Sequence, residues 1–127
     1  MLEIFYPDEY HSSTYKIDFQ SFYDAGYRGI IFDIDNTLVC HGAPADERSI
    51  RLVQSLKDMG FGVLFLSNNK EPRVKMFNDA VQAQYIFKAG KPKKNGYLKA
   101  MATLGTNRGN TLFVGDQLFT DVWGARN

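Results

Sequence analysis

Two aspartates stand two positions apart in the stretch Phe32-Asp33-Ile34-Asp35, directly after an apolar run. Because side chains at i and i+2 of a strand share one face, Asp33 and Asp35 should project together at the carboxyl end of this strand, where open α/β sheets bind ligands. Neighbouring carboxylates repel each other, and a cation allows both to stay ionised. Oxygen ligands suit Mg²⁺, so the pair predicts a magnesium site, whereas an isolated Asp-x-Asp is more often just a strand followed by a turn.

Three further apolar runs are each followed by polar residues that suit phosphate or metal chemistry: a hydroxyl, an ammonium group and a second pair of carboxylates. The residues concerned are Ser67 with Asn68, Lys91, and Asp116 with Asp121. Each one alone has a simpler explanation, because serine and aspartate are common in turns and helix caps and lysine is usually solvated. The chemistry is therefore indicated by the ordered set and not by any single member.

In this order the clusters resemble the four motifs of the haloacid dehalogenase-like (HAD) phosphatases: Asp-x-Asp-x-Thr, a Ser or Thr after the second strand, a Lys, and Gly-Asp-x-x-x-x-Asp. Further stretches look like the YqeG-type branch of subfamily IIIA, a capless group related to the mitochondrial phosphatidylglycerophosphate phosphatases. These stretches are Pro7-Asp8-Glu9-Tyr10, Asp35–Val39, Ser67-Asn68-Asn69, Lys91-Pro92 and Gly115–Val122. The resemblance runs from about residue 5 to residue 127.

The resemblance implies phosphoryl transfer through a covalent aspartyl phosphate. Asp33 would be the nucleophile, and Asp35 would be the general acid that protonates the leaving alcohol and then the base that activates water. Mg²⁺ would be held by Asp33, by the backbone carbonyl of Asp35 and by Asp116, with Asp121 binding directly or through a water molecule.

The remaining motif residues would bind the phosphoryl group or shape its surroundings. Ser67 would donate its hydroxyl to a phosphoryl oxygen, with Asn68 adding to this site, and Lys91 would neutralise charge on the equatorial oxygens. Lys91 is preferred to its neighbouring lysines because the family has a Lys-Pro pair here. Thr37 would hold the loop after the nucleophile, and Gly115 would let the backbone approach the metal closely.

Apolar runs alternate with helical patterns along the chain, which predicts a parallel, doubly wound α/β sheet. The resemblance makes this a HAD-like Rossmannoid fold in which the strand at 111–114 lies beside the strand at 28–32. The loop at 40–45 is too short for a cap domain, so the site should be open. Strands are expected at 28–32, 61–66, 85–87 and 111–114, and helices at 19–25, 46–59, 72–83, 95–104 and from near Thr120. The expected inward residues include Ile50, Val53, Leu56 and Met59, then Val74, Phe77 and Val81, then Tyr97, Leu98 and Met101.

The 127 residues are expected to form one domain, 1–127, with an aromatic-rich segment at 1–27 and a Rossmannoid core at 28–127. Eight of the eighteen aromatic residues lie in the first segment. We expect them to cover a face or edge of the sheet, the alternative being a surface that contacts lipid. The sequence stops about two turns into the last expected helix, which is typical of a C-terminally truncated or naturally shortened form.

The composition of the chain limits the classes of partner that it is expected to bind. A formal net charge of +1 gives no field that would favour nucleic acid or an anionic membrane, and one cysteine excludes an intramolecular disulfide. No signal peptide or membrane-spanning apolar run is evident, so a cytoplasmic location is expected, with at most peripheral contact with a membrane.

These features predict a Mg²⁺-dependent phosphomonoester hydrolase with an open site. Its substrate would be a phosphorylated small molecule or a lipid headgroup, phosphatidylglycerophosphate being the family precedent. The alternative is a non-catalytic HAD-like domain that binds Mg²⁺ and phosphate and acts through a protein partner. An oligomer that supplies a missing strand by exchange is a further expectation.

Overall fold

The computed structural model describes residues 2–4, 14–34, 38–39, 42–67, 70–87, 93–115 and 118–120, with the backbone alone at 2–4, 93–94 and 118–120. Six strands and four helices lie within these residues. They are β1 (Leu2–Ile4), α2 (Phe19–Asp24), β2 (Gly29–Phe32), α3 (Glu47–Met59), β3 (Gly62–Leu66), α4 (Glu71–Val81), β4 (Gln84–Ile86), α5 (Lys93–Leu104), β5 (Thr111–Val114) and β6 (Leu118–Thr120).

The strands form one sheet in the order β1-β6-β5-β2-β3-β4. The four strands β5, β2, β3 and β4 are mutually parallel, and β6 and β1 extend the sheet in antiparallel fashion beyond β5. The predicted parallel α/β sheet is confirmed, and so is the placement of β5 beside β2. Each predicted strand boundary is correct to within one residue.

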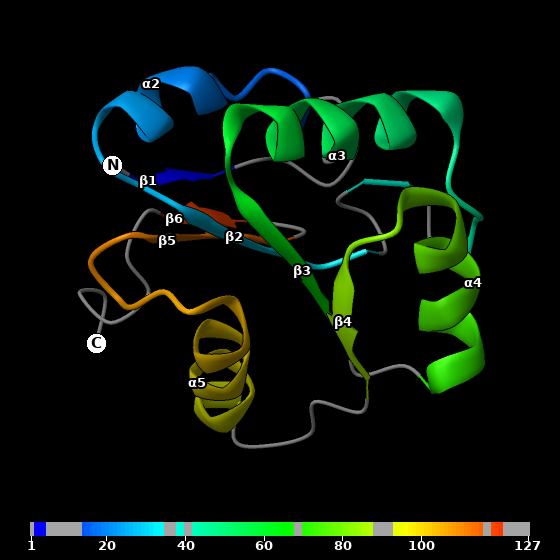
Figure 1. Ribbon diagram of the computed structural model, residues 1–127. Helices are drawn as coiled ribbons and strands as arrows, with labels where there is room; N and C mark the ends of the chain where they lie inside the picture. Colours follow the sequence, from blue (N-terminus) through cyan, green and yellow to red (C-terminus); the bar gives the residue numbers. More distant parts are fainter. Residues whose placement is uncertain are drawn as a thin grey trace.

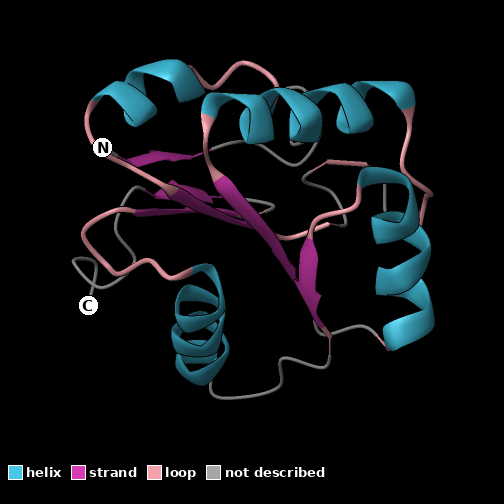
Figure 2. Ribbon diagram, viewed as in Figure 1, coloured by secondary structure: helices cyan, strands magenta, loops and turns pink. Residues whose placement is uncertain are grey.

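Helices cover both faces of the sheet, as a doubly wound fold requires (Figures 1 and 2). On one face lie α2, α3 and α4, and their core includes Phe32, Phe65 and Phe77. The rings of Phe65 and Phe77 meet edge to face with their centroids 5.2 Å apart. On the other face α5 packs over Ile31 and Leu64. Strand residues alternate between these two cores because successive side chains point to opposite faces.

The start of α3 is fixed by a capping box. The Asp46 side chain accepts from the Ser49 N–H at 2.8 Å, and the Ser49 hydroxyl lies 3.0 Å from the Asp46 N–H, which donates to it. Gly60 ends the helix in the left-handed region at φ 111°, a conformation that favours glycine. These caps fix where α3 begins and ends.

Replacing Asp46 by alanine should lower the free energy of unfolding by about 1 kcal/mol near neutral pH, because Ser49 loses its acceptor. Burial raises the pKa of Asp46, but the Ser49 hydrogen bonds and the Arg48 charge outweigh it and hold that pKa below its ordinary value of 3.8. A depressed folded-state pKa gives stability that is complete above the unfolded value and is lost as the pH falls through the folded value. Urea unfolding at neutral and acid pH checks this, with the exposed Asp58→Ala as the control; an unchanged difference in acid would contradict it.

Two residues predicted to face inward are exposed instead: Ile50 is 36% exposed and Leu98 is 40% exposed. The buried stripe of α3 is Ser49, Val53 and Leu56, which leaves Ile50 one position off the stripe. In α5 the small residue Ala100 is fully buried, so the helix rests on that side and turns Leu98 outward. The other expected inward residues pack against the cores, including Tyr97, Leu52 and Met59 at partial burial.

The prediction of a helix from near Thr120 is wrong for Thr120 itself, which lies in a strand. Leu118–Thr120 forms β6, whose residues Phe119 and Thr120 pair with β5, and whose whole length pairs with β1. An apolar, aromatic and β-branched triplet suits a strand when a sheet edge is available. Residues 121–127, the rest of that expected helix, lie outside the described residues.

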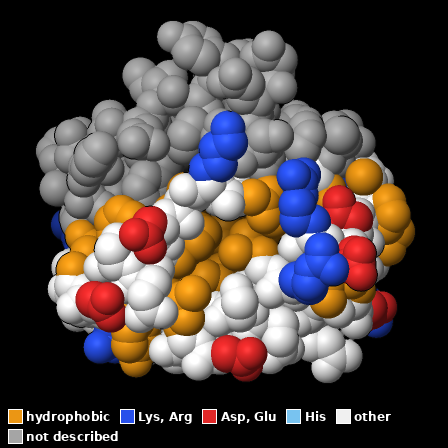
Figure 3. Space-filling view, turned by 90° about the horizontal axis from the view of Figure 1, so that it is seen from above, with side chains coloured by type: hydrophobic (Ala, Val, Ile, Leu, Met, Phe, Trp, Pro, Cys, Tyr) orange, Lys and Arg blue, Asp and Glu red, His pale blue; other side chains and the backbone are white. Residues whose placement is uncertain are grey.

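The aromatic residues of the N-terminal segment that the structure describes cover the α2–α3 side of the core. Phe19 is buried, with its ring 6.2 Å from that of Phe32. Four more are partly buried against the same cluster: Tyr15, Phe22, Tyr23 and Tyr27. Phe5, Tyr6 and Tyr10 lie outside the described residues. On the face seen from above, apolar side chains gather in the middle, and both acidic and basic side chains surround them (Figure 3).

Candidate active site

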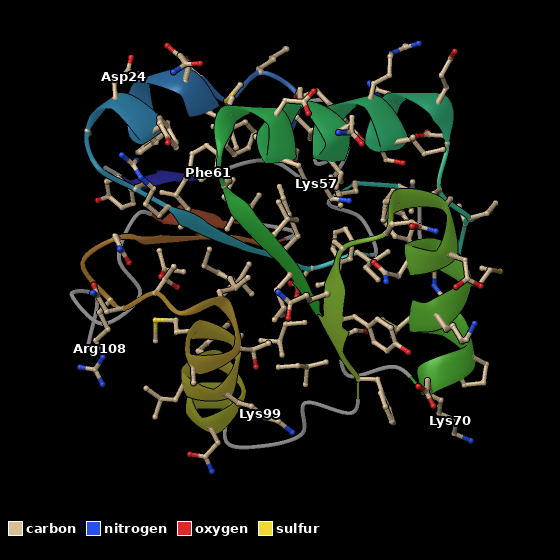
Figure 4. All side chains as sticks on the ribbon, in the orientation of Figure 1. Asp24, Lys57, Phe61, Lys70, Lys99 and Arg108 are labelled. Carbon is tan, nitrogen blue, oxygen red and sulfur yellow. The ribbon has the colours of Figure 1, made fainter. Side chains whose placement is uncertain are left out.

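Two of the predicted site residues come directly after neighbouring parallel strands. The Asp33 N–H donates to the Val114 carbonyl at 3.0 Å, and the Ser67 N–H donates to the Ile86 carbonyl at 3.0 Å. Phe32 lies opposite Phe65, so Asp33 and Ser67 leave β2 and β3 at the same edge of the sheet. In Figure 4 the label Phe61 stands at the start of β3, and Ser67, which directly follows the last residue of β3, belongs to the opposite end of that strand.

Asp33 is half-buried, and Gly115 lies close to its carboxylate. A Cβ atom added at Gly115 would stand 3.3 Å from Asp33 Oδ2 and 3.0 Å from Cε2 of the Phe113 ring. Any other residue at position 115 would therefore press on the Asp33 carboxylate and the Phe113 ring, and the pairing of β5 with β2 brings this end of β5 next to the first aspartate. Residue 116, the next in the chain, is one of the predicted metal ligands.

Tyr97 of α5 lies beside Phe113 and within reach of the Asp33 charge. Its ring meets that of Phe113 edge to face, with centroids 4.9 Å apart. Burial, and then the negative charge of Asp33, raises the pKa of Tyr97 to about 12, so its hydroxyl stays protonated at ordinary pH. The sequence pattern placed Tyr97 only in the core; nothing in its spacing indicates that it lies within reach of the Asp33 charge.

The other predicted site residues lie outside the described residues: Asp35, Thr37, Asn68, Lys91, Asp116 and Asp121. Among the residues that the structure does describe, no three His, Cys, Asp or Glu side chains gather in a group that could hold a metal ion. Of the four predicted metal ligands, the structure describes only Asp33. The roles of the other three stay predictions. The described part of the chain also contains no helix long and apolar enough to cross a membrane.

The family is decided by comparison with known proteins. Residues 41–127 match the family model described as haloacid dehalogenase-like hydrolase. A Bacillus subtilis (strain 168) protein named "Probable phosphatase YqeG" is 35% identical over 123 residues, which cover 96% of this chain and 72% of that protein. The chain belongs to the haloacid dehalogenase-like hydrolases. Within this family of enzymes it is of the YqeG type, which confirms the resemblance drawn from its motifs.

A solved structure supports the same fold. A protein of Streptomyces avermitilis MA-4680, described as a HAD family hydrolase, superposes with a TM-score of 0.57 at 14% sequence identity. The match covers 70% of this chain and 56% of that one, so the chain spans little more than half the length of this HAD structure. At this identity the likeness shows the fold alone. It supports the expected Rossmannoid fold for this HAD hydrolase.

Proposed function

We propose that this HAD hydrolase is a Mg²⁺-dependent phosphomonoesterase that works through a phosphorylated Asp33. The observation that carries the proposal is the closeness of Gly115 to the Asp33 carboxylate: a Cβ atom built on Gly115 would stand 3.3 Å from Asp33 Oδ2. Gly115 directly precedes Asp116, so its closeness to Asp33 supports a common site for the two acidic pairs, Asp33 with Asp35 and Asp116 with Asp121. A shared metal and phosphate site requires that these pairs lie together. A relative named as a phosphatase, 35% identical over nearly the whole chain, supports the same activity.

In the proposed reaction a carboxylate oxygen of Asp33 attacks the phosphorus atom, and the bond to the leaving oxygen breaks. Asp35 gives its proton to the departing alkoxide, so that an alcohol leaves and an aspartyl phosphate stays on the enzyme. Asp35 then removes a proton from water, which attacks the phosphorus and restores the Asp33 carboxylate with release of phosphate. Ser67 donates a hydrogen bond to a phosphoryl oxygen, and Lys91 offsets the charge of the oxygens.

The residues present suit Mg²⁺ as the cofactor. A carboxylate oxygen of Asp33, the Asp35 carbonyl, and the carboxylates of Asp116 and Asp121 are hard oxygen donors of the kind that Mg²⁺ prefers. The close approach of Gly115 to Asp33 Oδ2 brings the residue before Asp116 against the nucleophile. When bound, the ion would reduce the repulsion between the carboxylate nucleophile and the phosphate dianion.

The substrate site is proposed to be open. β2 ends at Phe32 and α3 begins at Glu47, so no folded cap domain stands between them. An open site accepts a phosphate carried by a large molecule or presented on a surface. We therefore include a lipid headgroup phosphate, such as that of phosphatidylglycerophosphate, beside phosphorylated small molecules. A lipid substrate would require peripheral contact with a membrane.

Phosphate release by the purified chain tests the proposal, with a generic aryl phosphate and with phosphatidylglycerophosphate, each in Mg²⁺ and in EDTA. We expect turnover in Mg²⁺ on at least the aryl phosphate and loss of it in EDTA, and the ratio of the two rates measures preference for lipid. A folded chain that releases phosphate from neither substrate would overturn the proposed activity.

Trapping of the intermediate separates this enzyme from a domain that only binds phosphate for a protein partner. Asp35→Asn removes the base that activates water, so a chain treated with aryl phosphate should keep a phosphoryl group on Asp33. Intact mass measurement and peptide mapping would find it. A binding domain would carry no covalent phosphate in either form.

A further inference from the structure

Tyr15 connects the N-terminal aromatic segment to the loop that follows Asp33. Its hydroxyl donates to the backbone carbonyl of Leu38 at 2.9 Å. The N–H of Leu38 donates to the Ile34 carbonyl at 3.1 Å, which closes a short turn between these two residues. Both backbone polar groups of Leu38 are therefore satisfied within the chain, and one of them depends on a side chain 23 positions away.

The turn is anchored at both ends. At its start the Asp33 N–H is bonded to Val114 of β5, and the Ile34 side chain is 2% exposed. At its end the Leu38 side chain is fully buried. Only three residues separate Ile34 from Leu38 in the sequence, and two of them are Asp35 and Thr37. Asp35, the proposed general acid, thus belongs to a stretch of five residues whose first and last members, Ile34 and Leu38, are both fixed.

Tyr15 is itself held in place from two sides. The guanidinium of Arg48 lies over its ring, 4.1 Å from the centroid, and its ring packs against the α2–α3 core. Burial, with the charge of Asp46 adding to it, raises the pKa of Tyr15 to about 12. The hydroxyl is therefore a permanent donor at ordinary pH. A ring fixed by Arg48 at the beginning of α3 gives its hydrogen bond to Leu38 a defined direction.

We propose that Tyr15 is a positioning residue for the hydrolase: by fixing the Leu38 carbonyl it holds the peptide that carries Asp35 in register with Asp33. The inference rests on the proposed function, because it assigns Asp35 the proton transfer to the leaving group. It gives the N-terminal segment a part in the reaction beyond covering the sheet. Tyr15 acts through the loop and does not touch the substrate.

Tyr15→Phe tests this with little risk to the fold, since the ring and its contact with Arg48 are kept. If proton transfer from Asp35 is impaired, kcat/KM should fall about tenfold for phenyl phosphate, whose leaving group needs the proton, and less for 4-nitrophenyl phosphate. A change in folding alone would lower both values equally. The unequal loss is thus the signature of positioning.

Tyr23→Phe is the matched control. Tyr23 comes from the same segment, is partly buried, and has the Arg28 guanidinium 3.7 Å from its ring centroid. It packs against Phe61, at the opposite end of β3 from the site (Figure 4). This variant should leave both kcat/KM values within about twofold of the unchanged chain.

Hydrogen exchange gives a second measurement that does not depend on turnover. Peptides that contain residues 34–39 should exchange faster in Tyr15→Phe than in the unchanged chain or in Tyr23→Phe, because Leu38 has lost its anchor. Equal exchange and an equal loss on both phosphates would overturn the inference while the proposed function stood. An unchanged chain without any phosphatase activity would overturn the proposed function and, with it, the role of Tyr15 in catalysis.

Discussion

Replacing Asp33 by asparagine should reduce phosphate release by at least about a thousandfold, the scale seen when a nucleophile is removed from an enzyme. The amide has nearly the same shape as the carboxylate but does not form a stable acyl phosphate. The backbone hydrogen bond from residue 33 to Val114 does not involve the side chain, so the strand end should be preserved. Initial rates in Mg²⁺, together with urea unfolding, measure the two effects separately.

Asp24→Asn is a suitable control for this substitution. Asp24 is exposed at the end of α2, where it accepts a hydrogen bond from Gln20 at 3.0 Å, and Figure 4 shows it far from Lys70 at the start of α4. It should keep full activity. If Asp33→Asn stayed as active as Asp24→Asn, Asp33 would not be the nucleophile and the proposed mechanism would be wrong.

Gly115→Ala should lower kcat/KM about a hundredfold, the expected scale for a displacement of the reacting group by a fraction of an ångström to an ångström. The new methyl group would stand 3.0 Å from the Phe113 ring and 3.3 Å from Asp33 Oδ2. The Phe113 ring is backed by Tyr97 and has little room to retreat. We therefore expect the neighbouring groups, the Asp33 carboxylate among them, to shift by a few tenths of an ångström.

A second substitution distinguishes this displacement from general damage. Phe113→Leu removes the ring atoms that the methyl group would meet, so Gly115→Ala/Phe113→Leu should recover part of the activity that Gly115→Ala loses. Gly62→Ala serves as the control, because its methyl group would meet a flexible atom of Leu104, 3.1 Å away, at the other end of β3. No recovery in the double variant, relative to Phe113→Leu alone, would show that steric pressure on Asp33 is not the cause.

The parallel core of the fold follows from local patterns in the sequence. β2 and β3 are continuous apolar runs because both their faces are covered, and Val74, Phe77 and Val81 of α4 are buried as their helical spacing predicts. The helix expected at 46–59 is α3, which Asp46 and Gly60 cap, residue types that commonly begin and end helices. The exposed side of a helix is harder to predict: Ile50 and Leu98 are apolar, and only the detailed packing angle of each helix places them outside.

Sequence patterns did not predict contacts between residues that lie far apart along the chain. The sequence shows an acidic motif at Asp33 and a glycine at Gly115, but not that Gly115 lies close to the Asp33 carboxylate. Tyr15 was one aromatic residue among eight, with no spacing that linked its hydroxyl to Leu38. β1 is three residues long, too short for a periodic signal, and it exists as a strand only because β6 offers its edge.

The pairing of β1 with β6 also determines the order in which the sheet can be assembled during synthesis. Leu2 lies opposite Thr120, so β1 must wait until residues 118–120 have been made before it finds its partner. β2 and β3, by contrast, are separated by one helix and can pair early. Since distant pairings form more slowly than local ones, we expect the β1–β6 edge to close last, and β1 to be the part of a nascent chain most exposed to wrong partners.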